Sequence, residues 1–179
     1  MKQIYGFGIK ADDYEKLNAH IEVICDRIWK ALENDYYIEA IALEHQLIEY
    51  LLGENLVVIH YLIIKLDMGK DSDVNDMLER DTAYTYARLN DLCLFFGAYD
   101  NKMHERLKGF NTERTNAVHK FFTRPREYAE LKPSAKMGIA VLKELLSITK
   151  ARVLRLEAIT APRSHPAPTE GSEHAPNLP

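Results

Sequence analysis

Apolar residues recur every three or four positions along most of this chain, and that period limits its fold more than any other feature. One such stripe comprises Leu17, Ile21, Ile24, Ile28 and Leu32. Three later ones comprise Tyr86, Leu89, Cys93 and Phe96, then Met103, Leu107, Phe110, Ala117 and Phe121, and finally Ile139, Leu142, Leu145, Leu146, Thr149, Val153 and Leu156. Each matches the turn of a helix that buries one face. Asp12, with Glu15 three residues later, predicts the start of the first helix.

A second helix is expected to begin near Asp35 and to be buried on more than one side, because it carries two apolar stripes. The stripes are Ile38, Ile41, Ile48 and Leu52, and Leu43, Leu47 and Leu51. The apolar run Leu56–Leu66 would also suit a buried strand, but no partner strand is evident. We therefore expect another helix there, after a break at Gly53. The run is much shorter than the roughly 20 residues that span a membrane, so we interpret it as a core element.

Together these patterns predict an all-α protein, a bundle of five or six helices. We expect residues 1–159 to form one domain, with Pro125 and Pro133 in the gap before the last helix. Residues 160–179 hold five of the seven prolines and little that could be buried. Such a composition predicts a Pro-rich disordered tail.

Cysteine usage and the N-terminus favour a cytoplasmic protein. Cys25 and Cys93 lie far apart within apolar runs, which favours buried free thiols over a disulfide. Residues 1–10 contain no sustained apolar stretch of the kind a signal peptide needs. We therefore expect a soluble chain that does not use a membrane as its partner.

The candidate metal motifs in the chain are incomplete. Asp71, Asp73 and Asn75 resemble the opening of a calcium loop, but Asp76 stands where Gly is needed and Thr82 where Glu is needed. The seven histidines include no pair at ligand spacing with a neighbouring Cys or carboxylate. We therefore expect neither a metal nor another cofactor.

Arg114 is unusual because it falls in the middle of the apolar stripe that runs from Met103 to Phe121. Burying an arginine is costly unless the guanidinium is paired, reaches water, or faces a cleft or another subunit. The segment from Asp100 to Arg126 has seven basic and three acidic residues, a net charge of +4 on a chain of net charge -4. The overall acidity argues against a protein whose whole surface binds nucleic acid. The local excess of basic residues suits either a phosphate-bearing ligand or a solvated helix face whose charge is neutralised by its neighbours.

Arg114 and His119, separated by four residues, lie in the run LKGFNTERTNAVHKFF. This run resembles the signature of the HEPN superfamily, an Arg-x(4–6)-His motif late in a helical bundle, often preceded by Phe-Asn as in Phe110-Asn111 here. The earlier run EAIALEHQLIEYLLG looks like the second helix of the family, which often carries an acidic residue; Glu49 is the candidate here. Thr115 stands directly after the arginine, where many members have Asn, and Asn116 comes one residue later.

The resemblance implies a metal-independent endoribonuclease in which two motifs meet at a homodimer cleft. His119 would transfer protons and Arg114 would clamp the phosphate, with Asn116 in support and with weaker supporting roles for Thr115 and Glu49. RNA-backbone contacts would come from Lys120, Arg124 and Arg126. A toxin or defence role, with an antitoxin or nucleotidyltransferase partner, would also be in keeping with the family.

Helix geometry predicts that Arg114 and His119 point apart, because five residues correspond to a rotation of about 140°. His119 would then lie beside Thr115 and Asn116, either of which could orient the imidazole. We therefore expect the arginine of one chain to approach the histidine of another. The alternative interpretation is a non-catalytic helical module that binds a nucleotide or a protein, or that dimerises, through the same cleft.

Overall fold

The computed structural model describes residues 11–66, 85–119, 121 and 127–160. Within these ranges the chain is an all-α bundle, as predicted, with five α-helices and one short 3-10 helix. The elements are α1 (Ala11–Glu33), α2 (Tyr37–Leu66), α4 (Tyr86–Phe95), α5 (Asn101–His119), η1 (Tyr128–Leu131) and α6 (Lys132–Thr160). None of the described helices is both long and apolar enough to cross a membrane.

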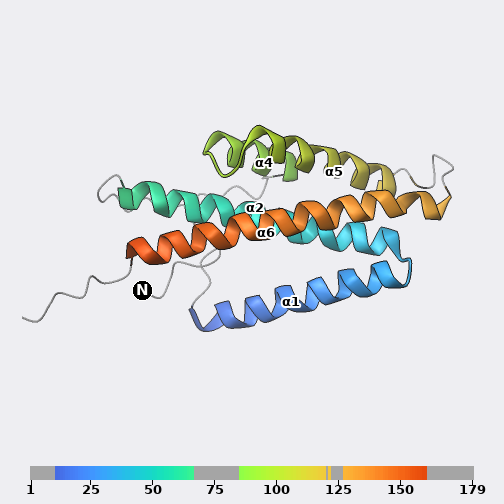
Figure 1. Cartoon of the computed structure of the whole chain (residues 1–179), viewed down its shortest axis with the longest axis horizontal. Helices are drawn as coiled ribbons and strands as arrows, with labels where there is room; N and C mark the ends of the chain where they lie inside the picture. The colour runs from blue at the N-terminus through green and yellow to red at the C-terminus, as the bar shows by residue number, and fades with distance from the viewer. Residues whose placement is uncertain (1–10, 67–84, 120, 122–126, 161–179) are drawn as a thin grey trace, which may run out of the picture.

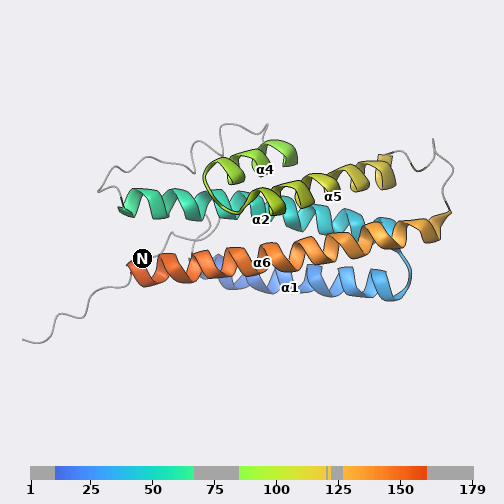
Figure 2. The ribbon, with the colours of Figure 1, turned by 45° about the horizontal axis from the view of Figure 1, so that its top comes forward.

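Helix α2 is the centre of the bundle and packs against each of the other four α-helices. It runs beside α6 in the same direction, while α1 and α5 run the opposite way (Figure 1). Helix α4 packs on α2, and α5 packs on both α2 and α6, whereas α1 packs on α2 at the other side of the bundle (Figure 2). This arrangement explains why α2 carries apolar residues on more than one side.

The predicted break at Gly53 is wrong, because α2 continues through it to Leu66 as a single helix. All nine residues from 51 to 59 are buried. Glycine costs a helix interior only about 1 kcal/mol relative to alanine, less than the burial of a single large apolar side chain provides. Packing on several sides therefore outweighs the local preference of Gly53.

Two of the helix ends are closed by the same backbone motif. Asp35, with φ 59°, follows α1, and Gly97, with φ 71°, follows α4. In each turn the next residue, Tyr36 or Ala98, donates its N–H to a carbonyl five residues earlier. This pattern satisfies carbonyls that a helix end leaves free. The second helix consequently starts at Tyr37, two residues after the predicted Asp35.

The N-termini of the later helices follow from their sequence. Thr85 accepts a hydrogen bond from the Arg88 N–H at the start of α4, and Asp100 accepts one from the Met103 N–H at the start of α5. Pro133 lies in the first turn of α6, not in the gap before it as predicted. The first turn tolerates proline because its N–H groups have no partner within the helix.

Both cysteines are free thiols, as predicted, although Cys25 is only half-buried whereas Cys93 is fully buried. The Cys93 thiol donates to the Leu52 carbonyl oxygen at 3.3 Å, which ties α4 to α2. The calcium-like run 71–82, Pro125 and the tail from residue 161 lie outside the described residues.

Candidate functional site

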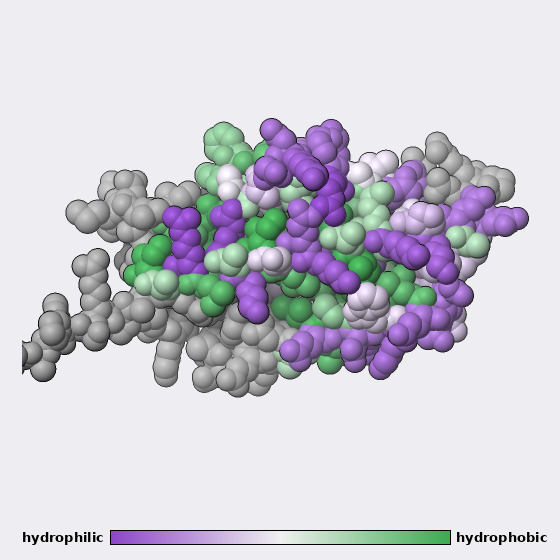
Figure 3. Space-filling view, viewed as in Figure 1, coloured by the Kyte–Doolittle hydropathy of each residue, from purple (hydrophilic) through white to green (hydrophobic). Residues whose placement is uncertain are grey.

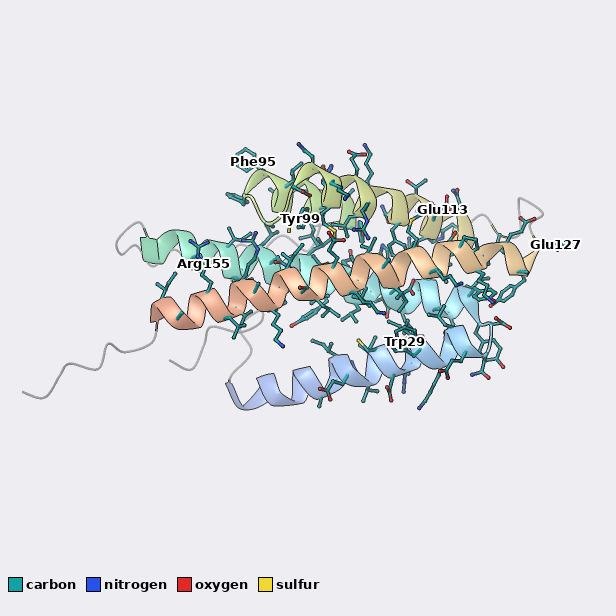
Figure 4. All side chains as sticks on the ribbon, in the orientation of Figure 1. Trp29, Phe95, Tyr99, Glu113, Glu127 and Arg155 are labelled. Atoms are coloured by element: carbon teal, nitrogen blue, oxygen red, sulfur yellow. The ribbon has the colours of Figure 1, made fainter. Side chains whose placement is uncertain are left out.

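Arg114 and His119 meet within one chain. The Arg114 Nη1 atom lies 3.1 Å from Nε2 of His119, near the C-terminal end of α5. Glu113, the residue before Arg114, marks this end of α5 in Figure 4, with Phe95 at the far side of the α4–α5 pair. The prediction that the two side chains point apart is therefore wrong, because the arginine is long enough to reach around the helix.

The contact sets the hydrogen-bond roles of the two side chains in this conformation. An arginine can only donate hydrogen bonds, so Nε2 of His119 is the acceptor. The lone pair on Nε2 is the one that a general base would use. In this conformation the guanidinium occupies it.

Arg114 is half-buried, in agreement with its position on an apolar stripe. Four stripe residues are fully buried beside it, namely Met103, Leu107, Phe110 and Ala117, and Phe121 is half-buried. Among the described residues, the Arg114 Nε atom is buried and has no hydrogen-bond partner. His119 at the other end of the contact is exposed. The pair therefore reaches from the edge of the core to the surface.

Helix α2 adds His45 to this group, a residue that the sequence analysis did not select. His45 is 7% exposed, and its ring stacks on Tyr86 of α4 with centroids 4.8 Å apart. The pKa of His45 is lowered to about 4, mainly by burial and then by the positive charge of Arg114. Two residues of α5 act on this pKa in opposite directions: the Asn111 side chain raises it and His119 lowers it. His45 is therefore neutral at pH 7 and belongs to the same cluster as Arg114, Asn111 and His119.

Tyr86 and Glu49 complete the surroundings of His45. The Tyr86 hydroxyl donates to the Leu107 carbonyl oxygen at 3.1 Å, which fixes the ring between α4 and α5. Burial, with the nearby charge of Glu49, raises the pKa of Tyr86 far above its usual value. The half-buried Glu49 places Oε2 at 3.9 Å from Nδ1 of His45. The weaker sequence candidate Glu49 thus lies next to the cluster through His45.

The other predicted site residues have different outcomes. Thr115 is half-buried and its hydroxyl donates to the Asn111 carbonyl oxygen at 2.8 Å, within its own helix. Asn116 is also half-buried, three residues before His119. The group that contacts Nε2 is Arg114, where the sequence had pointed to Thr115 or Asn116. The predicted RNA contacts Lys120, Arg124 and Arg126 lie outside the described residues.

The basic character of α5 is partly neutralised by neighbouring carboxylates. Arg106 forms an ion pair with Glu144 of α6, and the Lys108 ammonium lies 3.9 Å from Glu105. Hydrophilic residues gather over α4 and α5 on the face that Figure 3 shows, with hydrophobic residues along the middle of the bundle. The described part of α5 therefore presents a solvated surface of mixed charge. The guanidinium of Arg114 differs from its other charged groups because it lies at the edge of the core.

His45 could have been found by the reasoning that selected Arg114. It lies four residues after Ile41 and three before Ile48, in the middle of a stripe that the sequence analysis described as apolar. A polar side chain at such a position is costly unless it is satisfied. The apolar members alone define the period of this stripe, and His45 is not one of them.

Glu44, the neighbour of His45, occupies a different part of the core. It is fully buried, and neither carboxyl oxygen has a hydrogen-bond partner among the described residues. Burial raises its pKa to about 9, so the group is neutral at pH 7. A Cβ atom built on Gly138 of α6 would lie 1.9 Å from Oε2 of Glu44, so that glycine makes room for the carboxyl group.

Within the described residues, no three His, Cys, Asp or Glu side chains are grouped so that they could hold a metal ion. Comparisons with protein-family models, with curated proteins and with solved structures find no match to this chain. Its function is consequently argued from the Arg114–His119 pair and its surroundings.

Proposed function

We propose that the chain is a metal-independent endoribonuclease of the HEPN type, with Arg114 and His119 of one chain acting as a pair. The observation that supports this most is their 3.1 Å contact at the end of α5. It brings a cation that can bind phosphate within reach of an imidazole that can move protons near neutral pH.

The proposed reaction begins when a phosphate of the RNA binds the Arg114 guanidinium. A phosphate accepts two hydrogen bonds from a guanidinium and carries charge, so it competes well with a neutral imidazole. Release of Nε2 frees the lone pair of His119, which then accepts the proton of the ribose 2′-hydroxyl. Formation of the 2′-oxygen–phosphorus bond breaks the bond to the 5′-oxygen, which takes a proton from the imidazolium or from water.

Arg114 has its largest effect in the transition state of this reaction. The attacked phosphorus gathers negative charge on its oxygens, and a guanidinium already held near the site stabilises that charge with little reorganisation. Its half-buried position lowers the local dielectric, which strengthens the attraction. The proposed roles are therefore proton transfer for His119 and charge stabilisation for Arg114.

Cleavage of total RNA in EDTA tests the proposal. We expect the wild type to cut RNA, and His119→Ala and Arg114→Ala to lose activity by roughly 100-fold or more. His20→Ala is the matched control, because His20 is exposed on α1, outside the cluster. Products ending in a 2′,3′-cyclic phosphate are expected from 2′-hydroxyl attack.

Absence of cleavage by the wild type would contradict the proposal. The alternative, a non-catalytic binding module, is favoured by the carboxylates beside Arg106 and Lys108, which neutralise part of the basic face of α5. RNA or nucleotide binding that Arg114→Ala weakens, without any cleavage, would identify that module. A toxin or defence role and a nucleotidyltransferase or antitoxin partner stay predictions from the resemblance.

A further inference from the structure

A hydrogen bond between α5 and α6 lies directly beside the motif. The Ser134 hydroxyl donates to Oε2 of Glu113 at 2.9 Å. Ser134 is 5% exposed in the first turn of α6, and Glu113 is the half-buried residue before Arg114. Figure 4 marks Glu113 on α5, which packs on α6. A side chain of the neighbouring helix therefore holds the turn of α5 that carries Arg114.

Two further contacts join the same two helices farther from the motif. The Phe110 ring lies against Gly138, since a Cβ atom built on that glycine would lie 2.5 Å from Phe110 Cε2. Arg106 forms an ion pair with Glu144. Arg106, Phe110 and Glu113 are spaced four and three positions apart, so they share one face of α5. This face points to α6, and the Glu113 contact is the one of the three that lies nearest to Arg114.

The three contacts differ in how firmly they hold α5. The ion pair of Arg106 with Glu144 is partly exposed, and such pairs contribute little. Phe110 is fully buried and fixes the middle of the helix. Removing the Glu113 carboxylate would leave the buried Ser134 hydroxyl without this acceptor, which carries a cost. The contact near the motif is therefore more than a surface pairing.

The rotation of this turn decides where the Arg114 guanidinium lies. Arg114 Nε is buried, while Nη1 reaches Nε2 of His119 at 3.1 Å. A guanidinium stands much farther from the helix axis than its Cα atom does, so a small rotation of the turn moves it a long way. A phosphate clamp depends on such placement, because misplaced donors lose much of their effect.

We propose that Glu113 is a positioning residue, whose hydrogen bond with Ser134 holds the last turns of α5 against α6 and thereby sets where the Arg114 guanidinium lies. Its consequence for cleavage rests on the proposed ribonuclease function. Its consequence for the Arg114 side chain does not rest on that function.

Substitutions at both ends of the hydrogen bond test this role. Ser134→Ala removes the donor and Glu113→Ala the acceptor, whereas Glu113→Gln keeps an oxygen that accepts. We expect the single-turnover cleavage rate of either alanine variant to fall roughly 10-fold, with Tm close to wild type. The double alanine variant should be no slower than the slower single variant, because both changes break one contact. Glu113→Gln should retain most of the wild-type rate.

The matched control is Thr112→Ala, because the exposed Thr112 hydroxyl donates to the Lys108 carbonyl oxygen within α5. It should leave the cleavage rate unchanged. A wild-type rate in Ser134→Ala would overturn the positioning role. Rates that only follow Tm across the variants, or losses that multiply in the double variant, would overturn it as well.

The side-chain NMR signal of Arg114 Nε–H tests the inference without any reference to activity. In wild type this group is buried and should exchange slowly with water. We expect its signal to shift and its exchange to become several-fold faster in Ser134→Ala and Glu113→Ala, with Glu113→Gln close to wild type. An unchanged signal in both alanine variants would refute the positioning role even if the protein cleaves RNA. A changed signal in a protein that cleaves nothing would support the positioning role and refute the ribonuclease alone.

Discussion

Three polar residues on apolar stripes, Arg114, His45 and Glu44, carry the unusual chemistry of this bundle, and each avoids the cost of a buried charge differently. Arg114 stays charged and directs its guanidinium toward the exposed His119. His45 is neutral because burial and Arg114 lower its pKa to about 4. Glu44 is neutral because burial raises its pKa to about 9. The first two meet in the candidate site, whereas Glu44 faces α6.

Glu44 should make the free energy of unfolding depend on pH. Its pKa is about 9 in the folded chain against a reference value of 4.5, so unfolding allows it to ionise at neutral pH. The stability that this group contributes is therefore fully present below about pH 4.5 and is lost as the pH rises toward 9. We expect Glu44 to contribute a loss of roughly 3–4 kcal/mol between pH 5 and pH 8, measured by urea unfolding as the difference between wild type and Glu44→Gln, because both proteins share the opposing contribution of His45.

Glu44→Gln should remove the contribution of Glu44 to this slope, because an amide does not titrate in this range, and should leave only the opposing contribution of groups such as His45. Glu39→Gln is the matched control on the exposed face of α2 and should keep the wild-type slope. Parallel pH profiles for wild type and Glu44→Gln would contradict a neutral carboxyl group in the core.

At the scale of the elements, glycine has opposite roles in α5 and α6. Gly138 of α6 faces the core, where an added Cβ would lie 1.9 Å from Glu44 Oε2 and 2.5 Å from Phe110 Cε2. Gly109 of α5 has no atom within 4 Å of such a Cβ. Substitution of Gly138 therefore tests the packing between helices, and substitution of Gly109 tests the helix propensity of the residue.

We expect Gly138→Ala to lower the free energy of unfolding by about 1–3 kcal/mol, because Glu44 and Phe110 must shift within a close-packed core. Gly109→Ala should raise it by about 0.5–1 kcal/mol, because alanine favours a helix and meets no neighbour. Denaturant midpoints of the two variants check both signs. Stabilisation by Gly138→Ala would show that α2 and α6 do not approach each other this closely.

At the scale of the whole molecule, the position of α2 decides which side chains meet. It packs against α6, with α1 on one side and α4 with α5 on the other, so a polar residue on it faces one of these neighbours according to its place in the turn. His45 faces α4 and α5, while Glu44 faces α6 through Gly138. The contact within one chain also means that Arg114 and His119 need no second chain to meet.

Mixing experiments test how the proposed homodimer uses these pairs. If each site takes both residues from one chain, a mixture of Arg114→Ala and His119→Ala subunits should cleave RNA no faster than either variant alone. Subunit exchange is checked by sedimentation of differently labelled chains. Recovery of about a quarter or more of the wild-type rate would show instead that the arginine and histidine come from different chains.

The sequence by itself determined the all-α class and the helix faces, and it singled out Arg114 and His119 as candidates. The helical period and the arginine on an apolar stripe are local properties, because both follow from the spacing of residues along a helix with 3.6 residues per turn. Only the tertiary structure decided that α2 passes through Gly53, that His45 joins the cluster, and that Arg114 reaches His119. The first two outcomes depend on packing between helices that are distant in sequence. The third depends on the length of the arginine side chain, which the rotation about the helix axis between two residues does not describe.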